Sequence, residues 1–200
     1  ELNRLESALA ADHALEFLFV DDGSQDSTWE MLQSHASTKV NVRLARHFHR
    51  RGIAAALTTG IRQAQGDVVA SLDADCTYEP LMLARCLPLL TSGVDVVVAS
   101  PYHPAGAVVG VPAWRLTLSR MASGCYRSLM RNKLHTYTSC VRVCRKSAVA
   151  NVTLANDGFV GVVELLWHVD RRGGSIVECP ATLHVRQAGQ SKMRLLRTTL

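Results

Sequence analysis

The stretch DVVASLDAD (67–75) decides the fold class of this chain. Its first part is apolar and rich in β-branched residues, which is typical of a buried strand. It ends in two carboxylates one residue apart, Asp73 and Asp75. Ligands of open α/β sheets bind outside the carboxyl ends of the strands, where such a pair can hold a hard cation. The alternative is an ordinary turn at a strand end, because aspartate is common in turns.

Strands and helices alternate on either side of this stretch. The strands are expected at 15–20, 40–45 and 94–100, and the helices at 2–11, 52–65 and 80–90. Such alternation predicts right-handed βαβ units in a mostly parallel sheet that is covered by helices on both faces. The first half of the chain is therefore predicted to be an α/β unit.

The pattern changes after residue 100. The stretch 100–112 holds several prolines and glycines and is predicted to be a loop. Helices are expected at 114–129, 159–169 and 192–200, and extended segments at 136–147 and 173–186. No linker divides the chain, so its 200 residues predict one domain with a substantial core.

Composition narrows the class of protein. The chain is 48% hydrophobic and 20% charged, as expected for a globular domain. It contains no uninterrupted run of about 18 apolar residues, the length expected of a transmembrane helix. The six cysteines form no CxxC pair. Scattered cysteines of this kind predict free thiols in a reducing compartment, which we interpret as the cytoplasm.

The charges are distributed unevenly. Residues 1–95 carry 13 acidic and 8 basic side chains, whereas residues 96–156 carry 8 basic side chains and no acidic one. An acidic half that could hold a cation thus precedes a basic segment suited to anions. The basic residues are spread out and few aromatic residues accompany them, which argues against nucleic acid as a partner. A phosphate-bearing substrate or an anionic membrane surface fits better, and the alternative is a solubilising basic face.

Five stretches together carry a family resemblance. They are FLFVDDGSQDST (17–28), GIAAALTTGIRQAQGDVVASLDAD (52–75), TYTSCVRVCRKSAV (136–149), GFVGVVELL (158–166) and VRQAGQSKM (185–193). In this order they resemble the family-2 glycosyltransferases with a GT-A fold. The resemblance is greatest to the branch that includes dolichol-phosphate mannosyltransferases and polyprenyl-phosphate glycosyltransferases.

The resemblance implies an α/β fold of the GT-A type, a Rossmann-like and mostly parallel sheet sandwiched by helices. It implies a single glycosyltransferase domain over 1–200, with a nucleotide-sugar-binding half (1–100) and an acceptor-binding half (101–200). Members of the family begin with a strand and a proline-containing turn that precede the equivalent of residue 1. We therefore expect the first strand to lie upstream and regard the sequence as N-terminally truncated.

The resemblance assigns the donor side of the site to four aspartates. Asp75 is the leading metal ligand and a catalytic residue, and Asp73 is shared between the metal and the ribose. The expected cation is Mg²⁺ or Mn²⁺. Asp21 or Asp22 contacts the base or ribose of the nucleotide, unless Asp22 only forms a turn with the glycine that follows it. Relatives often have Leu-Gln after the second carboxylate where this chain has Cys76-Thr77, which leaves the rest of the coordination shell open.

Further residues are expected to contact phosphates. Arg51 is either such a contact or a solvent-exposed arginine. Gly52 and the small residues 54–56 would let the backbone approach a ligand closely. By resemblance, the second half supplies Arg142 as a catalytic residue near the phosphates and four further binding residues, Ser139, Arg145, Arg186 and Lys192.

The expected activity is an inverting, metal-dependent transfer of a hexose, mannose or glucose, from a nucleotide-diphosphate sugar to a polyprenyl phosphate. The expected place is the cytoplasmic face of a membrane. A phosphate acceptor is already ionised and needs no strong general base. For a sugar, lipid or protein hydroxyl as acceptor, Glu164 is the candidate base, and otherwise it is a surface residue of its helix. A binding module for nucleotides or polyanions without catalysis is the third interpretation.

Overall fold

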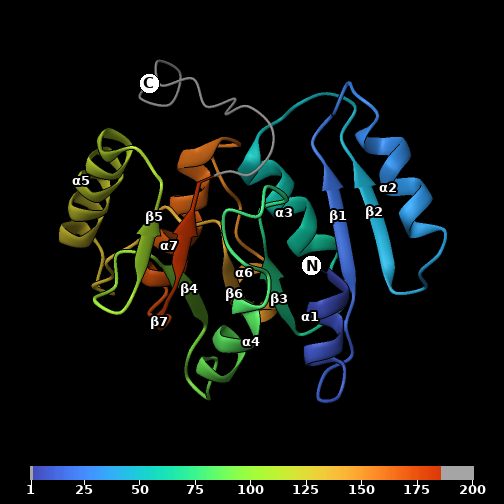
Figure 1. Ribbon diagram of the computed structural model, residues 1–200. Coiled ribbons are helices and arrows are strands. Elements are labelled where there is room, and N and C mark those ends of the chain that lie inside the picture. The colour runs from blue at the N-terminus through green and yellow to red at the C-terminus, as the bar shows by residue number, and fades with distance from the viewer. Residues whose placement is uncertain (1, 186–200) are drawn as a thin grey trace.

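The computed structural model describes residues 2–185 of the chain. Its strands form a two-stranded sheet of order β1-β2, a four-stranded sheet of order β3-β6-β4-β7 and a two-stranded sheet of order β5-β8. Figure 1 shows these strands between helices in an α/β arrangement.

The first part of the chain builds the β1-β2 sheet and its flanking helices. The elements are α1 (Leu2–Leu9), β1 (Phe17–Asp21), α2 (Thr28–Ala36) and β2 (Val42–Arg46). β1 and β2 are parallel, as the β-α-β order predicts, with Asp21 opposite Arg46 at their carboxyl ends. Helix α3 (Ile53–Gln63) follows and packs against β1.

The four-stranded sheet forms the centre of the molecule. It contains β3 (Val68–Ser71), β6 (Arg142–Arg145), β4 (Val96–Ser100) and β7 (Ile176–Pro180). β4 and β7 are parallel, whereas β6 runs antiparallel to both of its neighbours, β3 and β4. All five residues of β4 are buried.

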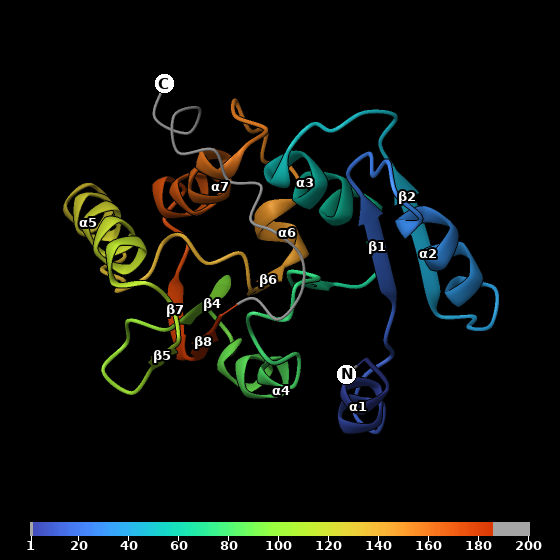
Figure 2. The ribbon, with the colours of Figure 1, turned by 45° about the horizontal axis from the view of Figure 1, so that its top comes forward.

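Helices cover both faces of this sheet. Val96 and Val98 of β4 belong to one apolar cluster together with α7 (Phe159–Arg171), whereas Val97 and Ala99 belong to a second with α1 and α4 (Met82–Cys86). Successive strand residues point to opposite faces, so one apolar strand supplies both clusters. Figure 2 shows α7 and α4 on the two sides of the strands.

Several elements differ from the sequence expectations. The stretch 100–112 contains a short strand, β5 (Ala107–Val109), and the late extended segment is divided into β7 and β8 (Thr182–His184). β5 and β8 pair in parallel. Only the end of 136–147 is a strand, and α6 (Lys146–Val149) follows it directly. The remaining elements are the 3₁₀ helix η1 (Leu87–Leu89) and α5 (Ala113–Leu129). The predicted helix 192–200 lies outside the described residues.

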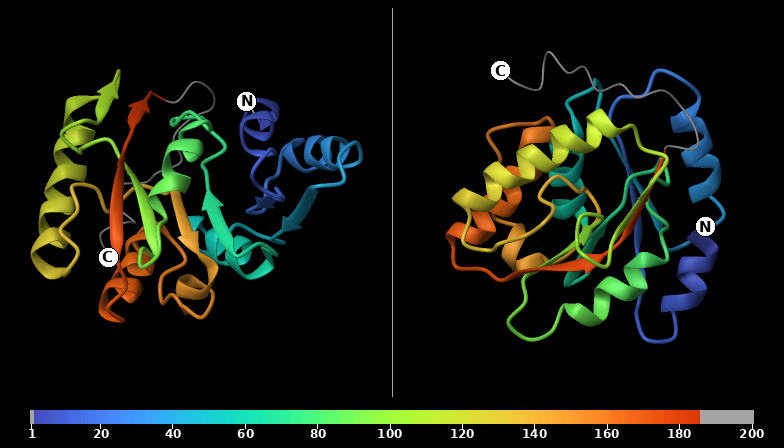
Figure 3. Two further views of the ribbon diagram at one scale, coloured as in Figure 1. Left: turned by 90° about the horizontal axis from the view of Figure 1, so that it is seen from below. Right: turned by 60° about the vertical axis from the view of Figure 1, so that its left-hand side comes forward.

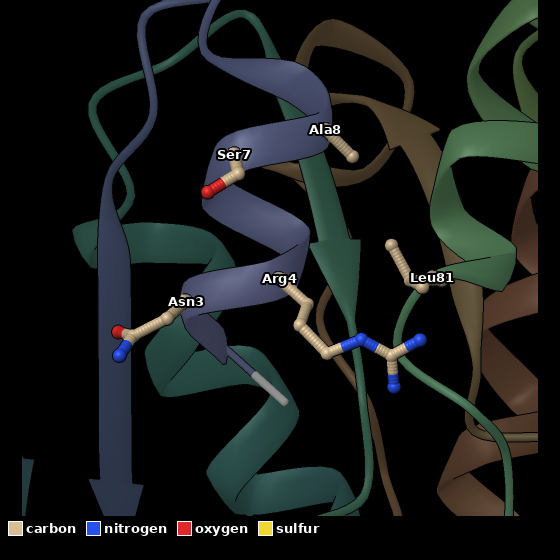
Figure 4. A pocket seen from close by; sticks show the side chains of 5 residues that line it. All are labelled: Asn3, Arg4, Ser7, Ala8 and Leu81. Carbon is tan, nitrogen blue, oxygen red and sulfur yellow. The ribbon is translucent and has the colours of Figure 1, made fainter.

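The prediction that 67–75 is a buried strand is wrong for β3. Val68 is 39% exposed, and exposed residues alternate with half-buried ones along the strand. The reason is that β3 is an edge strand of its sheet and does not pair with β1. β1 and β3 nevertheless point in the same direction (Figures 1 and 4). Their carboxyl ends therefore lie at the same edge of the molecule, where a ligand is expected. A strand upstream of residue 1 stays a prediction.

The cysteine side chains agree with the expectation of free thiols. All six cysteines are free, and Cys86, Cys144 and Cys179 are buried. Within residues 2–185, no helix is both long and apolar enough to cross a bilayer.

Candidate functional site

The turn after β1 is tied to the loop before α3 by the carboxylate of Asp22. This carboxylate accepts hydrogen bonds from the backbone N–H groups of Arg51 (3.0 Å) and Gly52 (2.8 Å), and its Oδ1 lies 2.7 Å from His47 Nδ1. His47 Nε2 in turn lies 2.9 Å from Thr59 Oγ1. Asp22 thus fixes the loop 47–52 against the strand end. The sequence carried no motif that identified His47 in this role.

Asp21 has hydrogen-bonding capacity left. Its Oδ1 accepts a hydrogen bond from the N–H of Ser24 (3.0 Å). Its Oδ2 lies 3.2 Å from Arg46 Nε, but the geometry is not that of a hydrogen bond, and this oxygen is buried without one among the described residues. The Arg46 guanidinium also stacks over the ring of Trp29, 5.0 Å from its centroid. A buried carboxylate oxygen without a donor suits an N–H or O–H group of a ligand. Of the two aspartates, Asp21 is therefore the better candidate for a nucleotide contact.

The space beside Gly52 is filled by the protein's own backbone. Gly52 has φ +127°, and a Cβ at this position would lie 2.4 Å from the carbonyl oxygen of Asp157. That oxygen accepts hydrogen bonds from the N–H groups of Ala54 (2.9 Å) and Ala55 (3.2 Å) at the start of α3. The glycine at position 52 is therefore explained by this backbone contact, and a close approach of a ligand to Gly52 and 54–56 stays a prediction. Arg51 is half exposed, and its Nη2 lies 3.6 Å from Asp157 Oδ2, so its contact with a phosphate stays a prediction.

Gly52→Ala is expected to lower the free energy of unfolding by about 2 kcal/mol or more, because L residues avoid this backbone region and the new methyl group meets a carbonyl oxygen. Urea denaturation measures the change. The matched control is Gly124→Ala in α5, where a Cβ has nothing within 4 Å and alanine favours the helix. A loss at Gly52 no larger than that at Gly124 would contradict the backbone contact.

Asp73 and Asp75 lie beyond the carboxyl end of β3. Asp75 Oδ1 accepts a hydrogen bond from the N–H of Thr77 (3.1 Å), and Cys76 between them has a left-handed φ of +52°. Ser71 Oγ donates to the carbonyl of Cys140 (2.6 Å), which joins this strand end to the segment before β6. The two carboxylates thus belong to a tight turn beyond a strand end, where the ligands of open α/β sheets bind.

The Cys140 thiol lies close enough to Asp73 for the charge of that carboxylate to affect its pKa. Burial raises the pKa of the Cys140 thiol to about 12, and the negative charges of Asp73 and Asp75 act in the same direction. The thiol is therefore protonated at neutral pH and is no nucleophile. The segment before β6, which the resemblance places in the site, does lie next to the two carboxylates.

Tyr78 is a further candidate site residue, which no motif in the sequence identified. It is buried, and burial raises the pKa of its phenol well above the ordinary value, while a hydrogen bond with Ser139 opposes the shift. Tyr102 and Asp73 also lie close enough to raise this pKa. The structure thus brings Ser139 and Asp73 together around one aromatic ring. The position of Tyr78, three residues after Asp75, was the only signal in the sequence.

Arg142 lies beneath this cluster and not at its surface. The residue has an exposed fraction of 0%, and its guanidinium donates to the carbonyls of Val162 (2.6 Å) and Tyr137 (3.0 Å). Burial lowers the pKa of Arg142, which the charge of Asp73 partly opposes. A direct contact between Arg142 and a phosphate, as the sequence analysis expected, does not agree with this geometry. Arg142 can act on the site through its charge and by supporting the strand.

The phosphate assignment of Arg145 is corrected. Because β6 is antiparallel to β3, Arg142 pairs with Ser71 but Arg145 pairs with Val68 at the other end of the strand. Three residues of a strand span about 10 Å. The Arg145 guanidinium donates to three backbone carbonyls around the loop before β4, those of Leu90, Thr91 and Val94.

Glu164 of α7 holds the loop before its own helix. One carboxylate oxygen accepts from the N–H of Ala155 (2.7 Å), and the other from the N–H and the side-chain amide of Asn156 (3.1 and 3.2 Å). Burial raises the pKa of Glu164, but these hydrogen bonds lower it by more, so that the net pKa lies below its usual value. Such a carboxylate is a weaker base than an ordinary glutamate.

The donor set is compatible with a divalent cation. Asp73 and Asp75 supply the carboxylate oxygens that Mg²⁺ and Mn²⁺ prefer. Within the described residues, no third His, Cys, Asp or Glu joins a group that could hold a metal. Water or phosphate oxygens would have to complete the shell, which fits a cation that binds together with a diphosphate. Arg186 and Lys192 lie outside the described residues.

An open pocket occurs between α1 and the start of α4. It has a volume of about 520 Å³ and is lined by Asn3, Arg4, Ser7, Ala8 and Leu81 (Figure 4). None of the predicted site residues lines it, and the Arg4 guanidinium lies 3.9 Å from Glu79 at its rim. The candidate site is therefore the cluster at the strand ends and not this pocket.

The comparison with known families agrees with these motifs. The sequence profile described as glycosyl transferase family 2 matches residues 2–153, which is most of the chain. The chain belongs to glycosyl transferase family 2. The predicted family is thereby confirmed, and the carboxylates after β3 lie inside the matched range.

Curated relatives of this family-2 chain act on lipid phosphates according to their names. The dolichol-phosphate mannosyltransferase of Pyrococcus furiosus is 29% identical over 194 residues, 96% of this chain and 54% of that protein. The polyprenol monophosphomannose synthase of Mycolicibacterium smegmatis is 31% identical over 184 residues, 88% of this chain and 69% of that protein. The chain thus spans about half to two thirds of the length of these relatives.

A solved structure supports the fold. The glucosyl-3-phosphoglycerate synthase from Mycobacterium tuberculosis, crystallised with Mn²⁺, uridine diphosphate and phosphoglyceric acid, has a TM-score of 0.67 and 23% identity. The similarity covers 98% of this chain and 66% of that one. The predicted α/β fold of the GT-A type is confirmed, and at this identity the likeness shows the fold alone.

Proposed function

We propose that this protein transfers a hexose from a nucleoside diphosphate sugar to a polyprenyl phosphate with inversion at the anomeric carbon, at the cytoplasmic face of a membrane. The observation that carries the proposal is the similarity to prenyl-phosphate mannosyltransferases over 88–96% of the chain. Mannose, the sugar in both relatives' names, is the first donor to test.

The state of Glu164 favours a phosphate acceptor over a hydroxyl. A hydroxyl acceptor needs a base to take its proton, and Glu164 was the candidate. Both of its oxygens accept hydrogen bonds from 155–156, and its pKa is lowered. A lipid phosphate attacks as an ionised oxygen and gives up no proton, so the reaction can proceed without that base.

The side chains of the cluster divide the work as follows. Asp21 accepts a hydrogen bond from the nucleoside, and Asp22 holds the loop that carries Arg51 toward the donor. A divalent cation held by Asp73 and Asp75 would neutralise charge that develops on the diphosphate. Tyr78 and Ser139 lie next to these carboxylates, and the side chain of Arg142 is buried in the protein behind them. An acceptor phosphate oxygen forms the new bond to the anomeric carbon as the bond to the diphosphate breaks.

A transfer assay with the full-length protein tests the proposal. Radiolabelled nucleoside diphosphate hexoses are incubated with polyprenyl phosphate or with soluble sugar acceptors, and the products are separated by solvent extraction. We expect label in the lipid-phosphate fraction that depends on Mg²⁺ or Mn²⁺. Label transferred to hydroxyl acceptors alone would overturn the lipid acceptor, and an absence of any transfer would favour a binding module.

Glu164→Gln is expected to retain transfer to polyprenyl phosphate within about threefold, because the amide oxygen still accepts a hydrogen bond from the loop and no base is required. The measurement is kcat in the same assay. Glu164→Ala is the companion variant and is expected to lower thermal stability, because it leaves the N–H groups of Ala155 and Asn156 without an acceptor. A hundredfold loss of kcat in a stable Glu164→Gln protein would instead identify Glu164 as a base.

A further inference from the structure

His47 is a buried histidine whose two ring nitrogens contact different parts of the fold. It directly follows β2 and is 9% exposed. Its Nδ1 lies 2.7 Å from Asp22 Oδ1 in the turn after β1, and its Nε2 lies 2.9 Å from Thr59 Oγ1 in α3. Its backbone N–H also donates to the carbonyl of Asp21 (2.9 Å). One residue thus connects the ends of two strands with a helix.

The chemistry of its two partners decides which ring nitrogen of His47 carries the proton. A carboxylate only accepts hydrogen bonds, so Nδ1 is protonated and donates to Asp22. In the neutral ring Nε2 then accepts from the Thr59 hydroxyl. Carboxylate, imidazole and hydroxyl follow the order of a nucleophilic triad. Thr59, however, lies in the interior of α3, where backbone N–H groups are bonded within the helix and form no oxyanion hole, so the arrangement suits positioning and not nucleophilic attack.

The loop that His47 begins is exposed and cationic. A Cβ on Gly23 would lie 2.6 Å from the carbonyl carbon of His49, so the loop rests directly on the turn after β1. Arg50 and Arg51 are exposed on it, and no acidic residue accompanies them. Figure 1 shows the chain running from β2 past the carboxyl end of β1 to α3. The loop therefore presents two arginines at the strand ends, where an anionic ligand is expected.

We propose that His47 is a positioning residue for the nucleoside diphosphate of the donor. It holds the Asp22 carboxylate, and that carboxylate holds the backbone N–H groups of Arg51 and Gly52. This inference rests on the proposed function and deepens it, because it names the side chain that orders the donor loop before the donor binds. A loop without this contact has to be ordered during binding, and that cost lowers the affinity for the donor without changing the chemical step.

Two variants each keep one of the two side-chain hydrogen bonds. The amide of His47→Asn can replace Nδ1 toward Asp22, whereas that of His47→Gln can replace Nε2 toward Thr59. We expect the KM for the donor to rise about tenfold in His47→Gln and only about twofold in His47→Asn, with kcat within about threefold of the unaltered chain. Helix α5, in the half expected to bind the acceptor, lies at the opposite end of the molecule (Figure 3), so the KM for polyprenyl phosphate should not change.

Direct binding of nucleoside diphosphates separates this inference from the proposed function. Guanosine, adenosine, uridine and cytidine diphosphate are titrated with Mg²⁺ into the full chain by calorimetry. We expect His47→Gln to bind the preferred nucleotide about tenfold more weakly than the unaltered chain, and His13→Gln, the same change at an exposed histidine, to bind it equally well. Equal binding by His47→Gln would overturn this inference alone. An unaltered chain that binds none of the four would overturn the proposed function and this inference with it.

A spectroscopic measurement keeps the test valid if His47→Gln fails to fold. Two-bond ¹⁵N–¹H correlation spectra of the unaltered full chain, labelled in its histidines, report which ring nitrogen carries the proton. We expect a protonated Nδ1 for His47, whose signals are identified by their absence in His47→Asn. An unprotonated Nδ1 would overturn the inference, because such a ring cannot donate to Asp22.

Discussion

Asp75→Ala is expected to lower kcat for hexose transfer by about a hundredfold to a thousandfold, because a group that stabilises charge developing in the transition state is lost. Asp75 follows β3 in a sharp turn, with its charge close to Cys140. Within the described residues, no third His, Cys, Asp or Glu joins Asp73 and Asp75, so loss of one carboxylate would remove half of the carboxylate ligands of the proposed cation. The rate should recover only in part at high Mn²⁺ concentration.

Two further variants separate charge from local structure. Asp75 Oδ1 accepts the N–H of Thr77, and asparagine keeps an acceptor there while it removes the charge. Asp75→Asn is therefore expected to fold normally and to lose about as much activity as the alanine variant. Asp12→Ala, a change to an exposed aspartate, is the matched control and should leave the rate unchanged. Full activity of Asp75→Ala at limiting metal would contradict the metal assignment.

Hydrophobic periodicity predicted those helices and strands well whose apolar residues are the ones that the fold buries. The β-branched run at 94–100 became β4, whose alternate residues pack into the two apolar clusters on either face of the sheet. Helices at 52–65, 114–129 and 159–169 begin and end within two residues of their predicted limits. In these segments the hydrophobic pattern, which is readable along the chain, coincides with the tertiary environment.

The sequence could not predict properties that depend on distant pairing. The direction of β6 follows from its place between β3 and β4, and no residue within 136–147 specifies it. That direction places Arg142 near the carboxylates and Arg145 at the opposite end, although the sequence analysis treated them alike. The exposure of β3 likewise follows from its position at a sheet edge. The candidate carboxylates were thus identified from their motif, whereas the positions of the arginine side chains relative to them became known only from the fold.

Arg142→Ala is expected to lower the free energy of unfolding by about 3 kcal/mol or more. Removal of the guanidinium leaves the buried carbonyl of Tyr137 without its Arg142 donor, at about 1–3 kcal/mol, and leaves a cavity. The carbonyl of Val162 loses a second hydrogen bond, since it also accepts one within α7. Burying the charge has its own cost, as the lowered pKa of Arg142 shows. That cost offsets part of the gain from the hydrogen bonds, but the cavity adds to the loss. Urea denaturation measures the change.

Conservative variants distinguish this structural role from a phosphate contact. Arg142→Lys keeps the charge, but an ammonium cannot reach both carbonyls as the planar fork does, so an intermediate loss of stability is expected. Arg62→Ala, an exposed arginine of α3, is the control and should change stability by no more than about 0.5 kcal/mol. If Arg142 instead contacted a phosphate, its variants would keep their stability and lose kcat. Because the guanidinium is enclosed and bonded to two backbone carbonyls, we expect instability first. In the fraction of Arg142→Ala that remains folded at low temperature, the loss of the charge near Asp73 should lower kcat only a little.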